Sequence, residues 1–289
     1  MLASPTSLVS NNAAVSATEG SHISTQQQKN KRMHFGFVEI GTSNYNTFTQ
    51  SCAGALYGRE DAWKFLPLDK SLTLMRGLAV DMKRESLKQL PNLSNVQKVH
   101  AAVSEVNGNL QMHYVPFSSI IRWERNFAKR GSRHGHAAMQ LARACSSLGK
   151  HSVLRRVLKR VGLLQLIRKK KVPVCSVERL FRRYRVGSVG VLALDCEGHD
   201  CAIVRGLLKA CKSRPEWYPE CLILETNGMN DELFGSGTED HTVSDLKACG
   251  YTVIYGGGYR STGARDTYLY RDPCAAAMHP KVSMPRVCR

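Results

Sequence analysis

The sequence predicts an α/β protein whose sheet is mostly parallel and closes with an antiparallel hairpin. From residue 33 onward, short and almost continuously apolar runs alternate with stretches of helical character, which is typical of parallel strands covered by helices on both faces. Hydrophobic residues make up 43% of the 289 residues and charged residues 22%. This composition suits a packed core and excludes collagen-like, coiled-coil and largely disordered chains.

The expected elements follow from the length and composition of each run. Short apolar runs predict strands of the parallel part at residues 34–41, 78–81, 96–103, 189–195 and 221–225. Helical spacing predicts helices over residues 85–90, 201–211 and 242–249, the last of which is followed directly by a glycine. Residues 251–255 and 266–270 are expected to form the closing hairpin.

Residues 1–32 are rich in Ser, Thr, Ala, Asn and Gln and contain no aromatic residue, so we predict a disordered tail. Residues 33–289 are expected to form one domain with a basic helical insertion at about 118–171. The tail has no basic start followed by an apolar stretch, which argues against a secretory signal. A cytoplasmic protein is expected, and an organelle transit peptide stays open as an alternative.

No apolar stretch approaches the roughly 18 residues of a membrane-spanning helix, so we do not expect an integral membrane protein. The ten cysteines form no C-x-x-C pair and fall mostly in apolar runs. This placement favours reduced, buried thiols over a disulfide framework or a zinc knuckle.

The positive charge is concentrated in one segment. The formal net charge is +18, and residues 122–186 contain 19 Lys or Arg and two acids, a net of +17 in that segment. Such a segment is expected to recruit an anionic partner: phosphate or sulfate groups, nucleic acid, or an acidic membrane surface.

Residues 152–171 within this segment have apolar side chains at three- and four-residue steps, which predicts an amphipathic helix. The favoured interpretation is a helix that packs on the domain and leaves a basic face in solvent. The alternatives are an interfacial helix on anionic lipid and a lid over an anionic substrate.

Ligands of parallel α/β sheets bind beyond the carboxyl ends of the strands, so the residues that end each expected strand are the candidates for a site. The first strand ends in Glu39 and a glycine turn at Gly41 with short polar side chains behind it. The second ends in Asp81, which suits a ribose acceptor and equally a helix N-terminal acid. The spacing between these acids exceeds the roughly 20 residues of a tight unit, so we place an insertion at 58–76. The fourth strand runs into the segment D-C-E-G-H-D, residues 195–200.

Four segments together resemble the FkbM-type family of S-adenosylmethionine-dependent methyltransferases. They are F-V-E-I-G-T-S-N from Phe37, A-A-V-S-E-V-N-G from Ala101, V-P-V-C-S-V-E-R-L from Val172 and L-A-L-D-C-E-G-H-D-C from Leu192. The resemblance covers about residues 33–271 and is weakest at 110–170. It implies a Rossmann-like class I methyltransferase fold with S-adenosylmethionine as the cofactor.

The resemblance also implies roles for individual residues. The cofactor-binding set it implies comprises Glu39, Gly41, Thr42, Ser43, Asp81, Ala102, Val103, Ser104 and Asp195. Asp81 stands where the family usually has Glu, and residues 102–104 match the turn near the adenine. Asp195, Glu197 and His199 match the stretch where methyl donor and acceptor meet. Among these three, His199 is the base best matched to neutral pH, Asp195 orients the cofactor's amino group and Glu197 positions the acceptor.

The expected function is therefore O-methylation of a small-molecule or glycan-like acceptor. RNA methylation is an alternative that the basic segment suggests, although few aromatic residues are available there for base stacking, namely Trp123, Phe127, Phe181 and Tyr184. A non-catalytic module that binds an anionic surface stays open as well. A dinucleotide dehydrogenase is disfavoured because the G-x-G-x-x-G pattern is missing. Carboxylates and imidazole in residues 195–200 suit a divalent ion, but we favour a site without metal.

Overall fold

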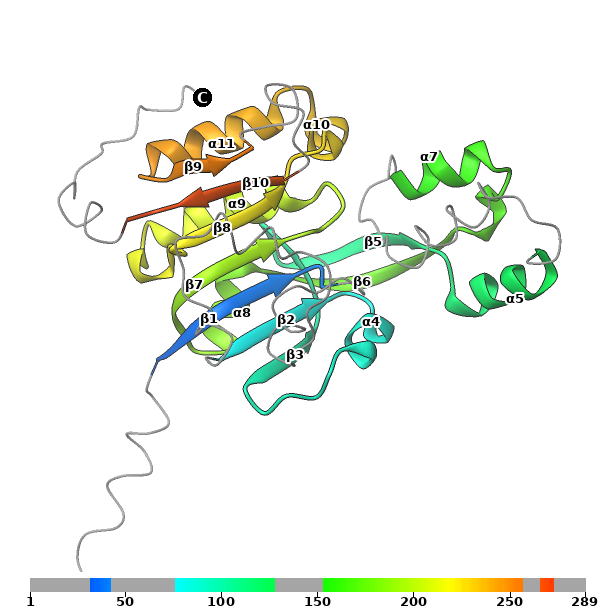
Figure 1. The fold of residues 1–289 in the computed structure, drawn as a ribbon, viewed down its shortest axis with the longest axis horizontal. Coiled ribbons are helices and arrows are strands. Elements are labelled where there is room, and N and C mark those ends of the chain that lie inside the picture. The colour runs from blue at the N-terminus through cyan, green and yellow to red at the C-terminus, as the bar shows by residue number, and fades with distance from the viewer. Residues whose placement is uncertain (1–31, 43–75, 128–152, 257–265, 273–289) are drawn as a thin grey trace, which may run out of the picture. The chain divides into compact units, whose positions relative to one another are not determined.

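A seven-stranded, mostly parallel sheet forms the centre of the protein, as the sequence predicted (Figure 1). The computed structural model describes residues 32–42, 76–127, 153–256 and 266–272. The strand order is β3-β2-β1-β7-β8-β10-β9. The bounds are β1 Met33–Ile40, β2 Gly77–Asp81, β3 Val96–His100, β7 Val186–Leu194, β8 Cys221–Glu225, β9 Thr252–Tyr255 and β10 Asp266–Tyr270.

The first five of these strands run parallel, and β10 is antiparallel to both β8 and β9. The closing hairpin is therefore confirmed. The order outward from β1 in both directions is compatible with a Rossmann-like, doubly wound sheet. The predicted tail at 1–32 and the insertion at 58–76 lie outside the described residues, apart from Arg32 and Arg76.

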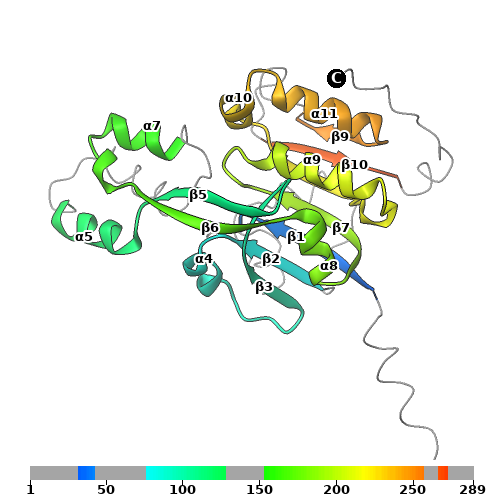
Figure 2. The same cartoon turned by 180° about the vertical axis from the view of Figure 1, so that it is seen from behind.

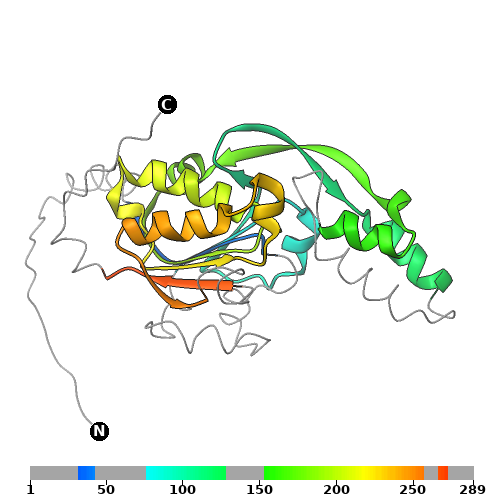
Figure 3. The same cartoon turned by 90° about the horizontal axis from the view of Figure 1, so that it is seen from above.

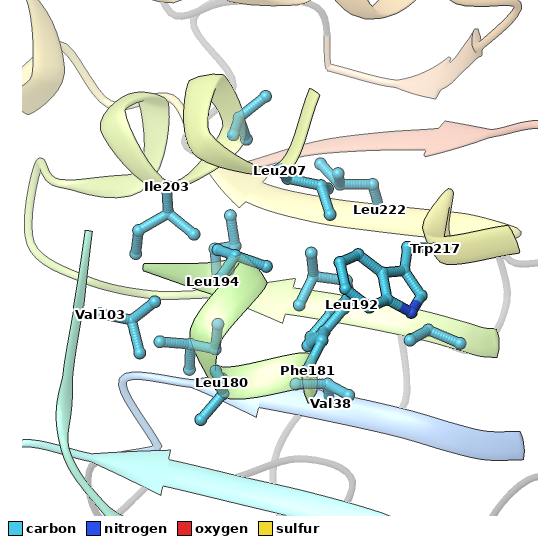
Figure 4. Close-up of a cluster of buried hydrophobic side chains, with 14 of the residues drawn as sticks. Val38, Val103, Leu180, Phe181, Leu192, Leu194, Ile203, Leu207, Trp217 and Leu222 are labelled. Atoms are coloured by element: carbon cyan, nitrogen blue, oxygen red, sulfur yellow. The ribbon is translucent and has the colours of Figure 1, made fainter. Parts of the chain in front are cut away.

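Helices pack on both faces of the sheet, and the strands are apolar on both sides because both faces are buried. The described helices of this part are α4 Arg84–Gln89, α8 Val177–Arg183, α9 Asp200–Cys211, α10 Met229–Phe234 and α11 Thr238–Ala248. The larger hydrophobic cluster joins β1, β7 and β8 to α8 and α9 (Figure 4). The opposite face carries a second cluster around Phe37, Val191 and Tyr268, to which α4 adds Leu87.

Aromatic side chains close the larger cluster at the end near the start of β7. The rings of Phe181 and Trp217 meet edge to face with centroids 5.6 Å apart. The indole N–H of Trp217 donates a 2.8 Å hydrogen bond to the carbonyl of Val186, so its polar atom is satisfied inside the core. The six described cysteines are all free thiols.

A second, three-stranded sheet of order β4-β6-β5 corrects one sequence expectation. Its strands are β4 Ala102–Ser104, β5 Gly108–Tyr114 and β6 Arg168–Ser176. Residues 96–103 are thus not one strand, because the chain leaves the main sheet at Ala101 and continues in the second sheet. The N–H of Ala101 still donates to the carbonyl of Asp81, at 3.0 Å. Neither glycine nor proline marks the change, so the sequence carries no local signal for it.

Strands β5 and β6 form an antiparallel ribbon that carries two helices, α5 Phe117–Phe127 and α7 Val153–Arg160, and a 3-10 turn, η3 Leu164–Leu166 (Figure 2). We call the described parts of residues 108–176 the basic arm. The arm extends beyond the carboxyl ends of the main strands (Figures 1 and 3). Leu154 and Leu158 of α7 are fully buried against Val115 and Ile120 in a small core of the arm's own.

The amphipathic helix expected over residues 152–171 is shorter than predicted, because α7 has only eight residues. It ends at Arg160, Gly162 follows with φ +70°, and Lys169 to Lys171 belong to β6. The apolar spacing continues past the helix because Leu166 and Ile167 of the following turn pack on the same small core. The apolar face of α7 is therefore covered by protein, as the favoured interpretation predicted. Its basic side chains at 155, 156, 159 and 160 are exposed. Among the described helices, none is long and apolar enough to cross a membrane.

Leu192 lies at the centre of the larger cluster and is fully buried. We expect Leu192→Ala to lower the free energy of unfolding by about 2–5 kcal/mol, because the truncation removes buried contacts and leaves a cavity between β7 and the helices. Lys209→Ala on the exposed side of α9 is the control and is expected to change it by less than about 0.5 kcal/mol. Urea unfolding followed by tryptophan fluorescence measures both, and equal losses would contradict the assignment of this core.

Candidate functional site

The main sheet reverses its strand order between β1 and β7, and this is the position at which ligands of doubly wound sheets bind. The chain leaving β1 and the chain leaving β7 run side by side there. The N–H of Asp195 donates to the carbonyl of Ile40 at 3.0 Å, and the N–H of Gly41 donates to the carbonyl of Val80 at 2.9 Å. The ends of β1, β2 and β7 are thereby joined through the backbone.

Gly41 is required at this position by its conformation and by its neighbours. Its φ is +85°, and a Cβ atom there would overlap the carbonyl oxygen of Asp195. Thr42 follows with 4% of its surface exposed, and its hydroxyl has no hydrogen-bond partner among the described residues. Ser43, the next predicted cofactor residue, lies outside the described residues.

Carboxylates gather where β7 and β8 end. Asp200 is completely buried, and burial, followed by the charge of Asp195, raises its pKa to about 8. Burial and then the charge of Asp195 likewise raise the pKa of Glu225, at the end of β8, to about 10. Glu197 adds to both shifts. We call Asp195, Glu197, Asp200 and Glu225 the acidic cluster.

Two oxygens of the acidic cluster are unsatisfied. One oxygen of Asp200 accepts a 3.2 Å hydrogen bond from the N–H of Cys196, and one oxygen of Glu225 accepts a 2.5 Å bond from the side chain of Asn227. The remaining oxygens, Asp200 Oδ2 and Glu225 Oε2, are buried without a partner among the described residues. Because an unpaired buried oxygen is costly, this arrangement fits a site that receives a donor or a cation.

The segment that carries the cluster is bent sharply. Glu197 has φ +53°, which is unfavourable for a residue with a side chain, and Gly198 has φ +90°. A Cβ atom on Gly198 would lie 2.9 Å from the carbonyl oxygen of Met229, so the bend is packed against α10. The turn brings Asp200 close enough to Asp195 for the charge of Asp195 to raise its pKa, although four residues lie between them in the sequence.

His199 faces a different group of residues. Its Nε2 lies 2.9 Å from the hydroxyl of Ser104, within hydrogen-bond distance. Burial lowers its pKa to about 4, with Glu105 and Arg205 as the charged groups that act on it. The imidazole is therefore neutral at physiological pH and weakly basic. Its ring lies 5.5 Å from that of Phe234, which is 42% exposed.

The other predicted residues are divided between the site and the core. Asp81 is buried at the end of β2 and accepts a 2.6 Å hydrogen bond from the N–H of Lys83, the residue that precedes α4. Its charge, together with those of Asp200 and Asp195, raises the pKa of the buried Cys196 thiol after the larger effect of burial itself. Asp81 thus lies near the acidic cluster.

Glu39 is 5% exposed and lies inside β1, in register with Ala79 and Ala193. Ala102 and Val103 are 4% exposed and pack in two hydrophobic clusters, so only their backbone is available to a ligand. Ser104 is hydrogen-bonded to His199 as described above. The structure thus brings Gly41, Asp81 and the acidic cluster together and gives residues 102–104 mainly structural contacts.

The sequence interpretation missed Glu225 and Phe234 as site residues. Glu225 ends the fifth predicted strand. The rule that ligands bind beyond the strand ends would have identified it, had the rule been applied to this strand as well. No sequence signal marks Phe234, because its position depends on how α10 packs against residues 197–199. Within the described residues, no group of three or more His, Cys, Asp and Glu is arranged to hold a metal ion.

No family model matches this chain, and comparison with curated proteins and with solved structures gives no match either. The function is therefore inferred from the arrangement of the residues in the site.

Gly41→Ala is expected to destabilise the protein and disturb the site, because the added methyl group overlaps the Asp195 carbonyl. Gly237→Ala is the matched control: its φ is +87°, but a Cβ atom there meets nothing within 4 Å. The control isolates the backbone penalty of about 1–2 kcal/mol, and Gly41→Ala is expected to lose about 1–3 kcal/mol more. Denaturant unfolding of both variants tests this, and equal losses would show that the close approach is absent.

The raised pKa of Asp200 predicts a pH-dependent stability. Between about pH 4, where the unfolded carboxyl titrates, and pH 8, the folded protein holds a proton that the unfolded chain releases, so stability falls as pH rises. Asp200→Asn keeps the side chain neutral and should make the unfolding free energy less dependent on pH in this window. Asp245→Asn on the exposed side of α11 is the control. If wild type and Asp200→Asn show the same pH slope, the carboxyl is not buried as described.

Proposed function

We propose that this chain is an S-adenosylmethionine-dependent methyltransferase of the FkbM type that methylates a hydroxyl group of a small-molecule or glycan-like acceptor. The observation that carries the proposal is the acidic cluster at the point where the strand order reverses. Its two unpartnered buried oxygens, on Asp200 and Glu225, are left for the polar groups of a ligand, and the charge of Asp195 favours a ligand that brings positive charge.

The methyl donor fits this environment by its charge. S-adenosylmethionine carries an ammonium group and a positively charged sulfur, and it supplies a methyl group bonded to that sulfur. The charge of Asp195 lowers the free energy of a cation close to the cluster, while Gly41 lets the chain after β1 lie against the backbone of Asp195, where the strand order reverses. The parallel sheet with its antiparallel closing hairpin supports the same proposal, since it is the architecture that the resemblance implied.

Each residue has a proposed role. Glu39, Gly41, Thr42 and Asp195 hold the amino-acid part of the donor, and Asp81 accepts hydrogen bonds from its ribose. The chain's remaining task is to align the acceptor hydroxyl and to take its proton, because alignment of two reactants supplies much of the rate of a displacement.

The proton acceptor is better assigned to Glu197 than to His199. The Nε2 of His199 lies 2.9 Å from the hydroxyl of Ser104, so this imidazole nitrogen is engaged by the protein itself, and burial lowers its pKa to about 4. Glu197 is partly exposed in the bent segment and lies close enough to Asp200 and Glu225 to shift their pKa values. His199 then acts as a positioning residue that fixes Ser104 against the start of α9.

RNA is the alternative acceptor, and the exposed Lys169 to Lys171 stretch of β6 is the observation that favours it. The aromatics of the basic segment whose side chains the structure describes are buried or partly buried, since Tyr184 also packs against the main core. Phe181 is completely buried in the main core, and Trp123 packs against the small core of the arm. We therefore place RNA behind a small or glycan-like acceptor, and a metal ion is not part of the proposal.

Binding of the methyl donor tests the proposal and separates an enzyme from a non-catalytic module. S-adenosylmethionine and its demethylated product are each expected to raise the melting temperature of the wild-type protein, because a ligand that binds only the folded state stabilises it. Asp81→Ala is expected to weaken binding by about tenfold or more in isothermal titration, since a charged hydrogen-bond acceptor is lost. Asp245→Asn serves as the control and should bind like wild type.

Turnover is tested with tritium-labelled methyl donor and fractionated glycans, lipids and RNA as acceptors. Label is expected in a glycan or small-molecule fraction, with Asp195→Asn and Glu197→Gln inactive. Label in RNA alone would establish the alternative acceptor. Absence of both donor binding and label transfer would refute the proposed function.

A further inference from the structure

A cavity of about 600 Å³ lies between the end of β2 and the basic arm. Its lining comes from the residues that follow β2 and begin α4, from the end of β3, and from β5, α5 and β6 of the arm. Cavities of a few hundred to about 1,000 Å³ are the usual size of small-molecule sites. We propose that this cavity binds a phosphate monoester of an aromatic compound, at a site separate from that of the methyl donor.

The charge of the lining favours a doubly charged anion. Lys83, Arg84 and Lys170 line the cavity against a single carboxylate, Glu85, which leaves a net formal charge of +2. A phosphate monoester carries about −1.5 to −2 near neutral pH, so it matches this charge better than a carboxylate or a neutral sugar does.

Two of these cations are available for a ligand. Neither Arg84 nor Lys170 has an ion-pair partner among the described residues, and both side chains are exposed. His100 also lines the cavity, and its ring Nε2 lies 3.1 Å from the carbonyl of Met82.

The remaining walls are apolar and partly aromatic. Met112, Val115 and Ile120 are buried behind the cavity, with 4%, 5% and 1% of their surface exposed. Phe117 at the start of α5 lines the same cavity and is 44% exposed, and Tyr114 of β5 is half-buried. An aromatic ligand body would cover the exposed ring of Phe117 while its phosphate group contacts the cations.

The cavity is distinct from the acidic cluster in composition. Glu39, Gly41, Asp195 and Glu197 do not belong to its lining. The basic arm contributes about half of the wall, so the arm has a defined use: it completes a pocket beside the main sheet. Ligand binding in this cavity does not require methyl transfer, because none of the lining residues is among those proposed to hold the methyl donor.

The β5–β6 ribbon offers a matched pair of lysines for the test. Lys170 pairs with Met112 in the ribbon, and both line the cavity. Lys169 is the adjacent residue and pairs with His113, and neither of these lines the cavity, because successive side chains of a strand point to opposite faces. Lys169→Gln and Lys170→Gln change the net charge of the protein equally, so a difference between them reports contact and not the overall electrostatic field.

The experiment measures binding of naphthyl phosphate by the anisotropy of its fluorescence, with the full-length protein. We expect naphthyl phosphate to bind at least about tenfold more tightly than naphthyl glucoside, which has the same ring and no charge, and more tightly than the singly charged naphthyl sulfate. Lys170→Gln and Arg84→Gln are each expected to weaken binding by about tenfold. Lys169→Gln and Lys88→Gln, a substitution on α4 outside the lining, are expected to bind like wild type.

The assignment of an aromatic phosphate ligand would be overturned by no binding of naphthyl phosphate, by equal binding of the neutral glucoside, or by equal loss in Lys169→Gln and Lys170→Gln. The demethylated product of the methyl donor, added at saturation, is expected to leave the affinity for naphthyl phosphate unchanged. Competition between the two ligands would show that the cavity belongs to the donor site and would overturn the separate assignment. Binding of naphthyl phosphate without any donor binding would refute the proposed function alone.

Discussion

The close backbone contact between Gly41 and Asp195 fixes the geometry on which the rest of the site depends. It holds the ends of β1 and β7 together where the strand order reverses, and the segment that begins at Asp195 carries three of the four residues of the acidic cluster. Folded proteins of this size are stable by only about 5–15 kcal/mol, so a buried group of like charges is a substantial opposing contribution. The protein reduces it by keeping Asp200 and Glu225 protonated near neutral pH. A cationic ligand would offset this unfavourable free energy further, so ligand binding would explain why the acidic cluster is present.

Most of the main sheet could be predicted because its strands are buried on both faces and are therefore apolar throughout. The runs that became β1, β2, β7 and β8 needed no knowledge of their partners. The break between β3 and β4 could not be predicted in this way, because Ala101 is compatible with either sheet and only the pairing of β4 with β6 reveals the change. A basic helical insertion was predicted at about 118–171, but the end of α7 and the start of β6 within it were not, since the apolar residues at 154–167 keep helical spacing while the chain turns around a separate small core.

The site was predictable to the level of strand ends and not to the level of side-chain direction. Asp81 and Asp195 follow directly from the rule that ligands bind beyond the carboxyl ends of strands. His199 is four residues from Asp195, yet it lies at the N-terminal boundary of α9, and the positive φ of Glu197 and Gly198 turns it toward Ser104. Backbone conformation of this kind depends on the packing of Gly198 against Met229 from α10, a contact that local sequence does not encode.

The two proposed binding regions carry charges of opposite sign. Residues 122–186, which include most of the helices and β6 of the basic arm, carry a net charge of +17 out of +18, whereas the acidic cluster lies at the ends of β7 and β8. An ion pair between Arg156 of α7 and Glu232 of α10 ties the arm to the helix that packs against the cluster's bent segment. Electrostatic interactions are screened over about 8–10 Å in solution but much less in partly buried sites. A cation would thus be favoured beside Asp195 and repelled from the cavity beside the arm, and an anion would experience the reverse, so the two proposed sites would take ligands of opposite charge.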